Sequence, residues 1–253
     1  MKDTVALVLA AGKGTRMYSE LAKVLHPVCG RTMLSYTLAT LEDLGLDRIL
    51  VVVGHQADRV KEVFAGAQVE WVLQSRQLGT AHAVQCALPH FTDFVGSILI
   101  CCGDTPLLTA ETLRMFQMEH VRVDADLSVL SMVLEEPGSY GRIVRNLRGE
   151  VRGIVEAKDA SEQERNIREV NSGIYCASAG LLRAVLQSID NANIQGEYYL
   201  TDLVQMAAVQ GWKVQAVTAS DPRELLGINT NEELEAAERI ISQRLQDKKS
   251  HGA

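Results

Sequence analysis

A glycine-rich segment near the N-terminus combines the residue types that bind phosphate. The string LAAGKGTRM (Leu9–Met17) follows directly on an apolar run and places Gly12 and Gly14 on either side of a lysine. Glycine lets the backbone turn tightly and bring N–H groups close to an anion. Arg16 and Lys23 can then add charge-assisted hydrogen bonds to phosphate oxygens. The segment predicts an anion-binding loop, although a glycine pair after a strand also serves simple turns.

This loop differs from the two most widespread phosphate-binding motifs. A dinucleotide fingerprint needs a third glycine that opens a helix, and a Walker loop needs Gly-Lys-Ser/Thr, whereas here Gly14 is followed by Thr15. The full string with its trailing arginine and lysine is therefore more informative than the glycine pair alone.

Strands and helices alternate through the first half of the chain and must position this loop. The expected strands are Val5–Ala10, Arg48–Gly54, Val69–Gln74 and Ser97–Asp104, and the expected helices are Met33–Leu44, Asp58–Phe64, Thr80–Leu88 and one capped by Thr109 that runs to Glu119. Continuous apolar runs indicate strands buried on both faces, and their alternation with helices predicts an α/β fold with a mainly parallel, doubly wound sheet. Ligands of such sheets bind beyond the carboxyl ends of the strands, which is where the glycine-rich loop lies.

After residue 125 the pattern changes to short β segments. Further strands are expected within residues 125–134, 141–146, 151–156, 171–178 and 213–217, and helices at Ala179–Ile189, Thr201–Gln210 and Glu232–Gln246. The strands predict a β-rich layer added over the first sheet rather than a second domain with its own core. We therefore expect one domain over residues 1–253, divided into 1–125, 126–230 and a C-terminal helix segment 231–253, the last six residues of which fray.

Composition excludes several classes of protein. The 253 residues are 47% hydrophobic and 23% charged, which is typical of globular rather than disordered or fibrous chains. The longest apolar runs, such as Val5–Ala11, are shorter than the roughly 18 residues of a membrane-spanning helix, and no signal-peptide pattern is present, so we expect a cytoplasmic protein that does not engage membranes. A net charge of −7 argues against nonspecific nucleic-acid binding but allows a small anion in a local basic pocket.

Nine motifs, in order along nearly the whole chain, carry a family resemblance. They are LAAGKGTRM, LAKVLHPVCG, WVLQSRQLGTAHA, GDTPLL, YGRIVR, VEAKDA, EVNSGIY, GEYYLTD and GINTNEEL. Together they resemble the N-acetylglucosamine-1-phosphate uridyltransferase domain of the bacterial bifunctional uridyltransferase/acetyltransferase family. The resemblance implies a Rossmann-like nucleotide-diphospho-sugar transferase fold and a reaction that joins UTP and N-acetylglucosamine-1-phosphate into UDP-N-acetylglucosamine, a precursor of peptidoglycan and lipopolysaccharide, and pyrophosphate.

In that family a left-handed β-helix follows and carries the acetyltransferase. Its hexapeptide repeats do not occur in these 253 residues, so we expect either a natural single-domain relative or a shortened chain. Because the family's β-helix builds its trimer, a monomer or weak homodimer is expected here.

On the nucleotide side, the resemblance implies roles for three groups of residues. Uracil and ribose are held by Leu9, Ala10, Ala11 and Gly12, the triphosphate is wrapped by Gly14, Thr15 and Arg16, and the uracil edge is read by Gln74, Gly79 and Thr80, with Gly103 completing the substrate site. An amide such as that of Gln74 offers both a donor and an acceptor to uracil. Lys23 is implied to reach the α-phosphate and stabilise charge in the transition state. Thr80 is also expected to cap the helix that follows.

The sequence departs from the family beside this lysine. It reads Leu-Ala-Lys where the family usually has Leu-Pro-Lys, so Ala22 lacks the fixed φ of a proline. We expect a looser loop with its charge unchanged.

Two further residues match the family's metal ligands. Asp104, just past a strand end, and Asn229 in GINTN are implied to hold Mg²⁺, which prefers oxygen ligands and shares them with substrate phosphates. Asp104 could instead form an Asx turn before Pro106, and Asn229 or Asn231 could cap the last helix. We favour Asn229 for the metal and Asn231 for the cap.

The implied sugar site draws on the second half of the chain. It consists of Gly141, Glu156, Asn171, Tyr199 and Thr201, whose backbone, carboxylate, amide and hydroxyl groups suit sugar hydroxyls and an N-acetyl amide. Glu156 and Lys158 could equally form an exposed ion pair. Two other functions stay open: a sugar-1-phosphate nucleotidyltransferase for another base or sugar, and a non-catalytic domain that binds nucleotide sugars.

Overall fold

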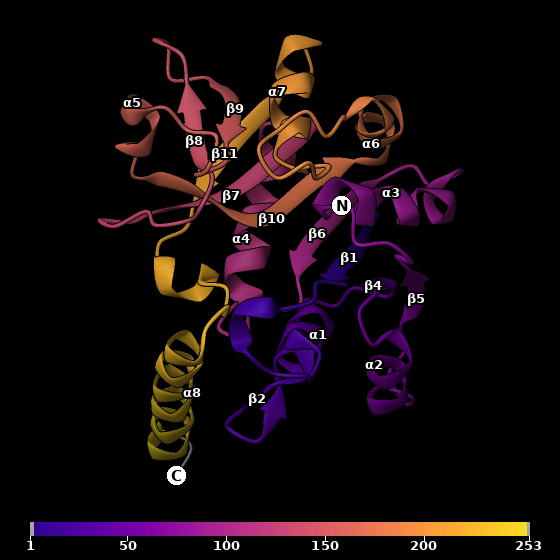
Figure 1. Ribbon diagram of the computed structural model, residues 1–253, viewed down its shortest axis with the longest axis vertical. Coiled ribbons are helices and arrows are strands. Elements are labelled where there is room, and N and C mark those ends of the chain that lie inside the picture. The colour runs from indigo at the N-terminus through magenta and orange to yellow at the C-terminus, as the bar shows by residue number, and fades with distance from the viewer. Residues whose placement is uncertain (1–2, 252–253) are drawn as a thin grey trace.

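A single mixed sheet forms the centre of the molecule. The computed structural model describes residues 3–251, and side chains through residue 247 (Figure 1). The strands of the sheet are β1 (Thr4–Ala10), β4 (Ile49–Val53), β5 (Glu70–Leu73), β6 (Ser97–Cys102), β7 (Leu127–Val133), β8 (Arg142–Arg145), β9 (Val151–Val155), β10 (Glu169–Ser178) and β11 (Val214–Thr218). Seven of them lie in the order β11-β7-β10-β6-β1-β4-β5, with β8 and β9 paired beside β10.

The strands of the first half are parallel, and β1, β4 and β6 are buried on both faces, whereas β5 at the edge of the sheet is partly exposed. β1 pairs in parallel with β4 and β6, and β5 continues the sheet beyond β4. Along β1 the side chains alternate, so that Val5 and Leu7 pack in one core cluster while Ala6 and Val8 pack in another. This two-sided burial explains why the sequence shows continuous apolar runs, and it confirms the predicted parallel sheet.

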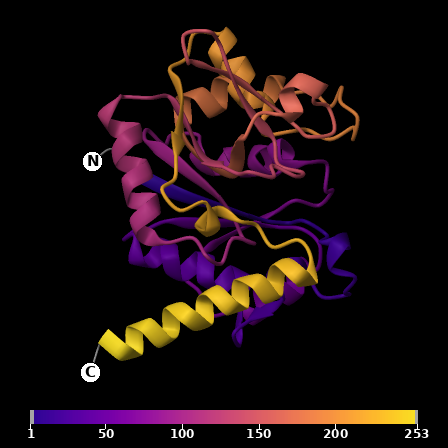
Figure 2. The same cartoon turned by 90° about the vertical axis from the view of Figure 1, so that its left-hand side faces the viewer.

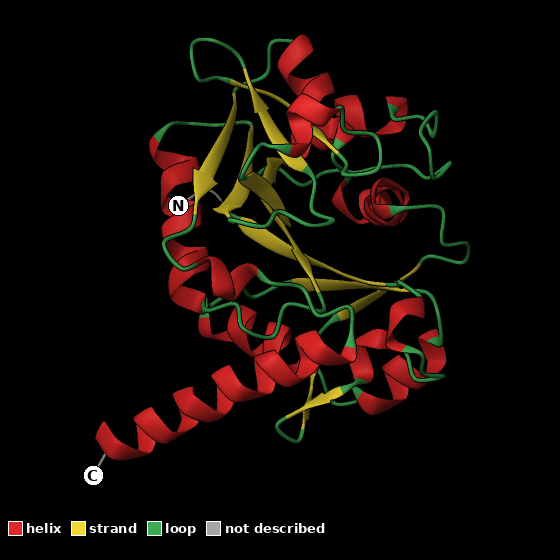
Figure 3. Ribbon diagram, turned by 60° about the vertical axis from the view of Figure 1, so that its left-hand side comes forward, coloured by secondary structure: helices red, strands yellow, loops and turns green. Residues whose placement is uncertain are grey.

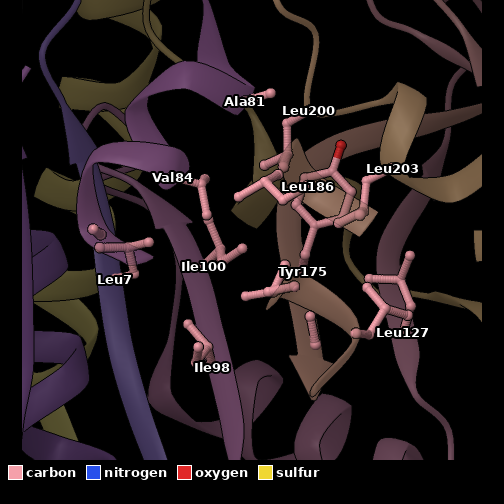
Figure 4. Packing of buried hydrophobic residues seen from close by; sticks show 14 of the residues in the cluster. Leu7, Ala81, Val84, Ile98, Ile100, Leu127, Tyr175, Leu186, Leu200 and Leu203 are labelled. Carbon is pink, nitrogen blue, oxygen red and sulfur yellow. The ribbon is translucent and has the colours of Figure 1, made fainter. Parts of the chain in front are cut away.

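Helices cover both faces. The helices are α1 (Met33–Asp43), α2 (Ala57–Val63), α3 (Thr80–Ala87), α4 (Ala110–Arg122), α5 (Glu162–Arg165), α6 (Ala179–Val185), α7 (Asp202–Val209) and α8 (Asn231–His251). One core cluster draws its helical side chains from α3, α6 and α7, and the other from α1, α2 and α4. Figure 4 shows the first, where Leu7, Ile100 and Tyr175 of three neighbouring strands meet α3 and α7. The doubly wound arrangement is visible in Figure 3.

The second half of the chain extends this sheet more than it covers it. β10 runs antiparallel to both β6 and β7, and β11 pairs in parallel with β7 at the edge. Only the β8–β9 hairpin, attached at Val170↔Arg142, leaves the plane, and α7 packs on it. The expected β-rich layer is therefore continuous with the sheet of the first half, because β10 lies between β6 and β7.

The last helix is joined to the body by a third apolar cluster. Ala237 and Ile241 of α8 pack with Val28 of β2 (Pro27–Val28) and with Met17. β2 forms with β3 (Arg31–Thr32) a small hairpin that the sequence pattern did not predict. The far end of α8 projects beyond the rest of the molecule (Figure 2).

Three local expectations differ from the structure. Thr80 is the first residue of α3 rather than its cap, and its hydroxyl accepts from the Leu200 N–H (3.0 Å). The cap of α8 is Thr230, whose hydroxyl accepts from the Glu233 N–H (3.2 Å), instead of Asn231. The expected frayed tail is helical as far as His251, and Gly252 and Ala253 lie outside the described residues.

The expected cap of α4 is confirmed, because the Thr109 side chain accepts from the Thr112 N–H. Of the helices that the structure describes, none has the length and apolar character needed to cross a membrane.

Candidate active site

The glycine-rich loop leaves the carboxyl end of β1 and turns into the short 3-10 helix η1 (Thr15–Met17). Gly14 has a φ of 63°, and a Cβ there would lie 2.6 Å from the Cβ of Lys23. Glycine is needed at this position both for the backbone angle and for the close approach. Met17 is buried in the apolar cluster that contains Ala237 and Ile241 of α8, and this packing anchors the end of the glycine-rich loop.

Four charged or polar side chains meet beyond the strand ends. The Lys23 ammonium donates to Asp104 Oδ2 and to Asn229 Oδ1 (2.7 Å), and the Arg16 guanidinium also donates to Asn229 Oδ1 (2.8 Å). Asp104 and Asn229 stand 125 positions apart in the sequence, yet their oxygens share one ammonium. The structure thus brings together the cationic loop and the two residues predicted as metal ligands.

The segment before α8 carries Asn229 to this place. The Ile228 N–H donates to the backbone oxygen of Asp104 (3.0 Å), which fixes the register of the two segments. Asn229 Nδ2 donates to the Gly227 oxygen (3.1 Å), so the amide oxygen faces the cations. The Glu233 carboxylate accepts from the backbone N–H of Asn229 and from that of Thr230 (3.1 Å).

Tyr140 supports the same segment from the opposite side. Its hydroxyl accepts from the Gly227 N–H (3.3 Å), and burial raises the pKa of this phenol. Tyr140 carries no sequence signal for this role, because its partner Gly227 is 87 positions away in the chain. Glu233 follows Thr230 by three residues, the spacing of a capping box, and this signal could have identified its contact with the Thr230 backbone.

The donor set fits a hard divalent cation. Asp104 supplies a carboxylate and Asn229 an amide oxygen, and the described residues contain no cluster of three or more His, Cys, Asp or Glu that would suit zinc. Magnesium is usually bound by one or two protein oxygens together with substrate phosphates and water. The alternative in which Asp104 only forms a turn is not what the structure shows, because its carboxylate pairs with Lys23.

The predicted base-reading residue is held in one orientation. Gln74 follows β5 and is only 3% exposed, and its Nε2 donates to the Gly79 oxygen (3.0 Å) and faces His82 Nδ1 (3.0 Å). With His82 in the tautomer that leaves Nδ1 unprotonated, both amide hydrogens are engaged, and Oε1 is the group left to meet a ligand. The sequence predicted both a donor and an acceptor here, whereas the geometry leaves the acceptor.

The predicted base-reading loop is joined by backbone contacts to the segment that holds the predicted sugar residues Tyr199 and Thr201. Tyr198 N donates to the Leu78 oxygen (2.8 Å), and Ala81 N donates to the Tyr198 oxygen (2.9 Å). Gly79 has a φ of 121°, and any Cβ there would collide with the Tyr198 backbone. A glycine is therefore required where the two halves of the site touch.

The predicted sugar residues form a second group. Asn171 N donates to the Gly141 oxygen (2.8 Å), and Thr201 donates to Glu156 Oε1 (3.0 Å). A Cβ on Gly141 would lie 3.6 Å from the Glu156 carboxylate, so these residues line one space. Tyr199 stands slightly apart, with its hydroxyl accepting from Gln195 Nε2 (2.7 Å).

Burial dominates the electrostatics of the sugar group. Desolvation raises the pKa of Glu156, and the Thr201 hydrogen bond and the nearby Arg142 charge lower it in part. The ion pair considered between Glu156 and Lys158 is not formed, because Lys158 donates to Gln195 Oε1 (2.6 Å) instead.

The thiol of Cys102 lies between the Lys23–Asp104 pair and the strand that carries Asn171. Cys102, at the end of β6, donates to the Gly173 oxygen (3.6 Å), two residues from Asn171. Burial, aided by the neighbouring Asp104 charge, raises its pKa to about 12. The Cys102 thiol is therefore protonated, and hence uncharged, at neutral pH.

A doubly wound sheet with a cationic glycine loop and an acid–amide pair at its carboxyl edge defines the class of nucleotidyltransferases. A family model for the MobA-like NTP transferase domain matches residues 6–172. The chain belongs to this family, whose members generally use a divalent metal ion and act on small molecules.

Two curated relatives are similar to this chain along nearly its whole length. The bifunctional protein GlmU of Trichlorobacter lovleyi is 49% identical over 246 residues, which cover 97% of this chain and 54% of that protein. That of Geobacillus thermodenitrificans is 48% identical over 97% of this chain and 53% of that protein. The chain spans about half the length of the curated relatives it matches.

A solved structure confirms the fold. A Bacillus anthracis protein assigned as a glucose-1-phosphate thymidylyltransferase superposes with a TM-score of 0.74, covering 94% of each chain at 20% identity. At that identity the likeness concerns the architecture alone.

Proposed function

We propose that this chain transfers a uridylyl group from UTP to N-acetylglucosamine-1-phosphate and releases pyrophosphate. The observation that carries the proposal is the convergence of Lys23 and Arg16 with Asp104 and Asn229, between a base-reading loop and a group of sugar-binding type. The high identity to proteins named bifunctional GlmU supports the choice of substrates.

The chemistry requires positioning more than proton transfer. A phosphate oxygen of the sugar phosphate attacks the α-phosphorus of UTP in line, the new P–O bond forms, and the bond to the β-phosphate breaks with release of pyrophosphate. The nucleophile is already an anion, because the second pKa of a sugar phosphate is about 6. No general base is needed, which agrees with the lack of any Ser/His/Asp set among the predicted site residues.

The cations of the glycine loop stabilise the charge that develops. Lys23 and Arg16 are proposed to turn from Asn229 toward the phosphates, where fixed positive charge lowers the transition-state energy. Holding two anions side by side supplies much of the remaining acceleration. A Mg²⁺ ion held by Asp104 and Asn229 would neutralise phosphate charge when bound.

Selection of uracil follows from the orientation of Gln74. With both amide hydrogens held by Gly79 and His82, Oε1 can accept from the N3–H of uracil. Cytosine has an unprotonated N3 at the corresponding position and would meet that oxygen lone pair to lone pair. The backbone of Leu9, Ala10, Ala11 and Gly12, the loop residues Gly14 and Thr15, and Gly103 are proposed to complete the nucleotide site.

The remaining expectations are part of the same proposal. Residues 1–125 would bind the nucleotide and 126–230 the sugar, through Gly141, Glu156, Asn171, Tyr199 and Thr201. We propose a cytoplasmic enzyme that makes a precursor of peptidoglycan and lipopolysaccharide, as a monomer or weak homodimer, without nucleic-acid or membrane partners.

The test is pyrophosphate release with each nucleoside triphosphate and several sugar-1-phosphates in the presence of Mg²⁺. UTP with N-acetylglucosamine-1-phosphate is expected to be the best pair. Higher turnover with another base or sugar would favour a related nucleotidyltransferase. Tight binding of UDP-sugar without any pyrophosphate release would favour a non-catalytic binding domain.

A further inference from the structure

The backbone next to Lys23 keeps a proline-like conformation without a proline. Ala22 precedes the 3-10 helix η2 (Lys23–Leu25) and has a φ of −53°, within the range that a prolyl ring imposes. It is only 2% exposed. Its N–H, which a proline would lack, donates to Gln56 Oε1 (3.1 Å).

The same side chain makes a second contact with the loop. Gln56 Nε2 donates to the backbone oxygen of Glu20. One amide thus engages an acceptor and a donor of the Glu20–Ala22 backbone, and both of its polar atoms are used. Two hydrogen bonds from one rigid plane restrict the backbone immediately before Lys23.

Gln56 is itself anchored to the sheet. Its backbone oxygen accepts from the Val60 N–H (3.0 Å) at the start of α2, and the neighbouring His55 N–H donates to the Ala11 oxygen (3.2 Å) at the end of β1. Gln56 also has a φ of 53°, a left-handed conformation that a non-glycine residue adopts only when its surroundings hold it. The contact therefore links the loop to the carboxyl ends of two strands.

We propose that Gln56 is a positioning residue for Lys23. Its amide restricts the loop by hydrogen bonds in the place where a proline at residue 22 would restrict it by covalent geometry. The loop was expected to be looser without proline. The structure instead shows that two hydrogen bonds from Gln56, the residue before α2, restrict it. The consequence for catalysis rests on the proposed function of Lys23, whereas the mechanical link does not.

Four proteins test the link: the wild type, Gln56→Ala, Ala22→Pro and the double variant. We expect Gln56→Ala to lower kcat for pyrophosphate release about tenfold, because small misplacements of a catalytic group are costly, with the KM for the sugar phosphate within about twofold. In the double variant the proline ring restores φ, needs no N–H partner and has room where the Gln56 amide was. Its kcat is expected within about threefold of the wild type.

Controls separate positioning from general damage. Gln187→Ala, at an exposed glutamine of another surface, should leave kcat unchanged. The thermal unfolding midpoint of Gln56→Ala should fall by only a few degrees, the cost of one buried N–H left without an acceptor, while amides of Glu20–Leu25 exchange faster with deuterium. If Gln56→Ala does not fold, Gln56→Glu takes its place, because it keeps the acceptor for Ala22 and loses the donor to Glu20.

Unchanged kcat and exchange in Gln56→Ala would overturn the proposal, and so would equal losses from Ala22→Pro in both backgrounds. If the wild type releases no pyrophosphate from UTP, the proposed function fails. The exchange measurement then still tests the link between Gln56 and the loop.

Discussion

The predicted phosphate side of the site and its predicted sugar side neutralise charge in different ways. The first consists of Arg16, Lys23, Asp104 and Asn229, and the second of Gly141, Glu156, Asn171, Tyr199 and Thr201. On the phosphate side, Asp104 faces a cation directly, and Lys23 and Arg16 share Asn229 as an acceptor. On the sugar side, Glu156 is held by a neutral hydroxyl, and desolvation raises its pKa. The paired cations and carboxylate of the first side would suit the proposed binding of anionic phosphates and of a metal ion, which can each replace one member of the pair. A buried carboxylate suits a neutral sugar, whose hydroxyls can replace water as donors.

The two sides also differ in the elements that carry them. The phosphate side lies on parallel strand ends and loops, with the Asn229 segment folding back from near the C-terminus. The sugar side consists of Asn171 on antiparallel β10, Gly141 and Glu156 at the ends of the β8–β9 hairpin, and Tyr199 and Thr201 just before α7. Loss of a charge should therefore damage chemistry on the first side, and binding and pH response on the second.

The largest effects are expected on the phosphate side. Lys23→Ala and Asp104→Ala should each lower kcat at least about a hundredfold, the scale of losing one preorganised charge. Steady-state pyrophosphate release checks this, with Lys61→Ala and Asp58→Ala on α2 as matched controls. Near-normal turnover in either folded active-site variant would refute the assignment.

Loss of the Asn229 amide, a proposed metal ligand, should change the dependence of activity on Mg²⁺ more than it changes substrate binding. Asn229→Ala is expected to raise the Mg²⁺ concentration for half-maximal activity at least about tenfold, because one of two protein oxygens is lost. Asn231→Ala, two residues later and outside the charged cluster, is the matched control. An unchanged Mg²⁺ titration, measured also by binding of Mn²⁺ to the UTP complex, would remove Asn229 from the metal site.

A substitution on the sugar side should weaken binding and stabilise the fold. Glu156→Gln is expected to raise the KM for the sugar phosphate about tenfold, as an acceptor is lost, with a smaller change in kcat. It should also raise the unfolding midpoint at neutral pH by about 2–4 °C, the shift that 1 kcal/mol produces in a chain of this size.

The sign of the stability effect follows from the raised pKa of Glu156. A carboxyl group whose pKa is raised by folding favours the folded state when protonated, and this contribution is lost as pH rises through the folded pKa. The advantage of Glu156→Gln should therefore shrink as pH falls toward the ordinary range of a carboxyl group. Thermal melts across that range measure it, and an advantage that grew with falling pH would contradict the assigned cause.

The smallest effect is expected at the hydrogen bond between Gln74 and His82, where the amide is oriented without an ion pair. His82→Leu frees one hydrogen of the Gln74 amide, and the ratio of kcat/KM for UTP over CTP should fall about fivefold, a loss of roughly 1 kcal/mol of discrimination. His82→Asn, which can keep an acceptor near the position of Nδ1, should retain most of the preference. A ratio that stays constant in His82→Leu would show that Gly79 alone orients the amide.

Local sequence patterns predicted much of the fold. Apolar runs marked β1, β4 and β6 because strands buried on both faces need them. The β2–β3 hairpin escaped prediction because each of its strands has two residues and shows no periodicity. The cap of α8 was placed one residue late because Asn231 was chosen by residue type alone. Thr230 and Glu233 have the spacing of a capping box, and the structure shows both of its hydrogen bonds.

Family resemblance supplied most of the site residues, and the structure added how they are held. No spacing in the sequence indicates that Tyr140 supports the Asn229 segment, or that Thr80 uses its hydroxyl on Leu200 instead of its own helix. These contacts join residues of different elements, and side-chain type alone does not encode such distances.

The sequence by itself determined the order of strands and helices, the glycine loop and the supply of cations, because backbone preference and hydrophobic periodicity act over a few residues. Tertiary structure decided that the oxygens of Asp104 and Asn229 share the ammonium of Lys23, and that Gln56 bridges Glu20 and Ala22. The physical reason is range: hydrogen bonds and ion pairs act over about 3 Å, and only the folded sheet brings such distant segments within that distance.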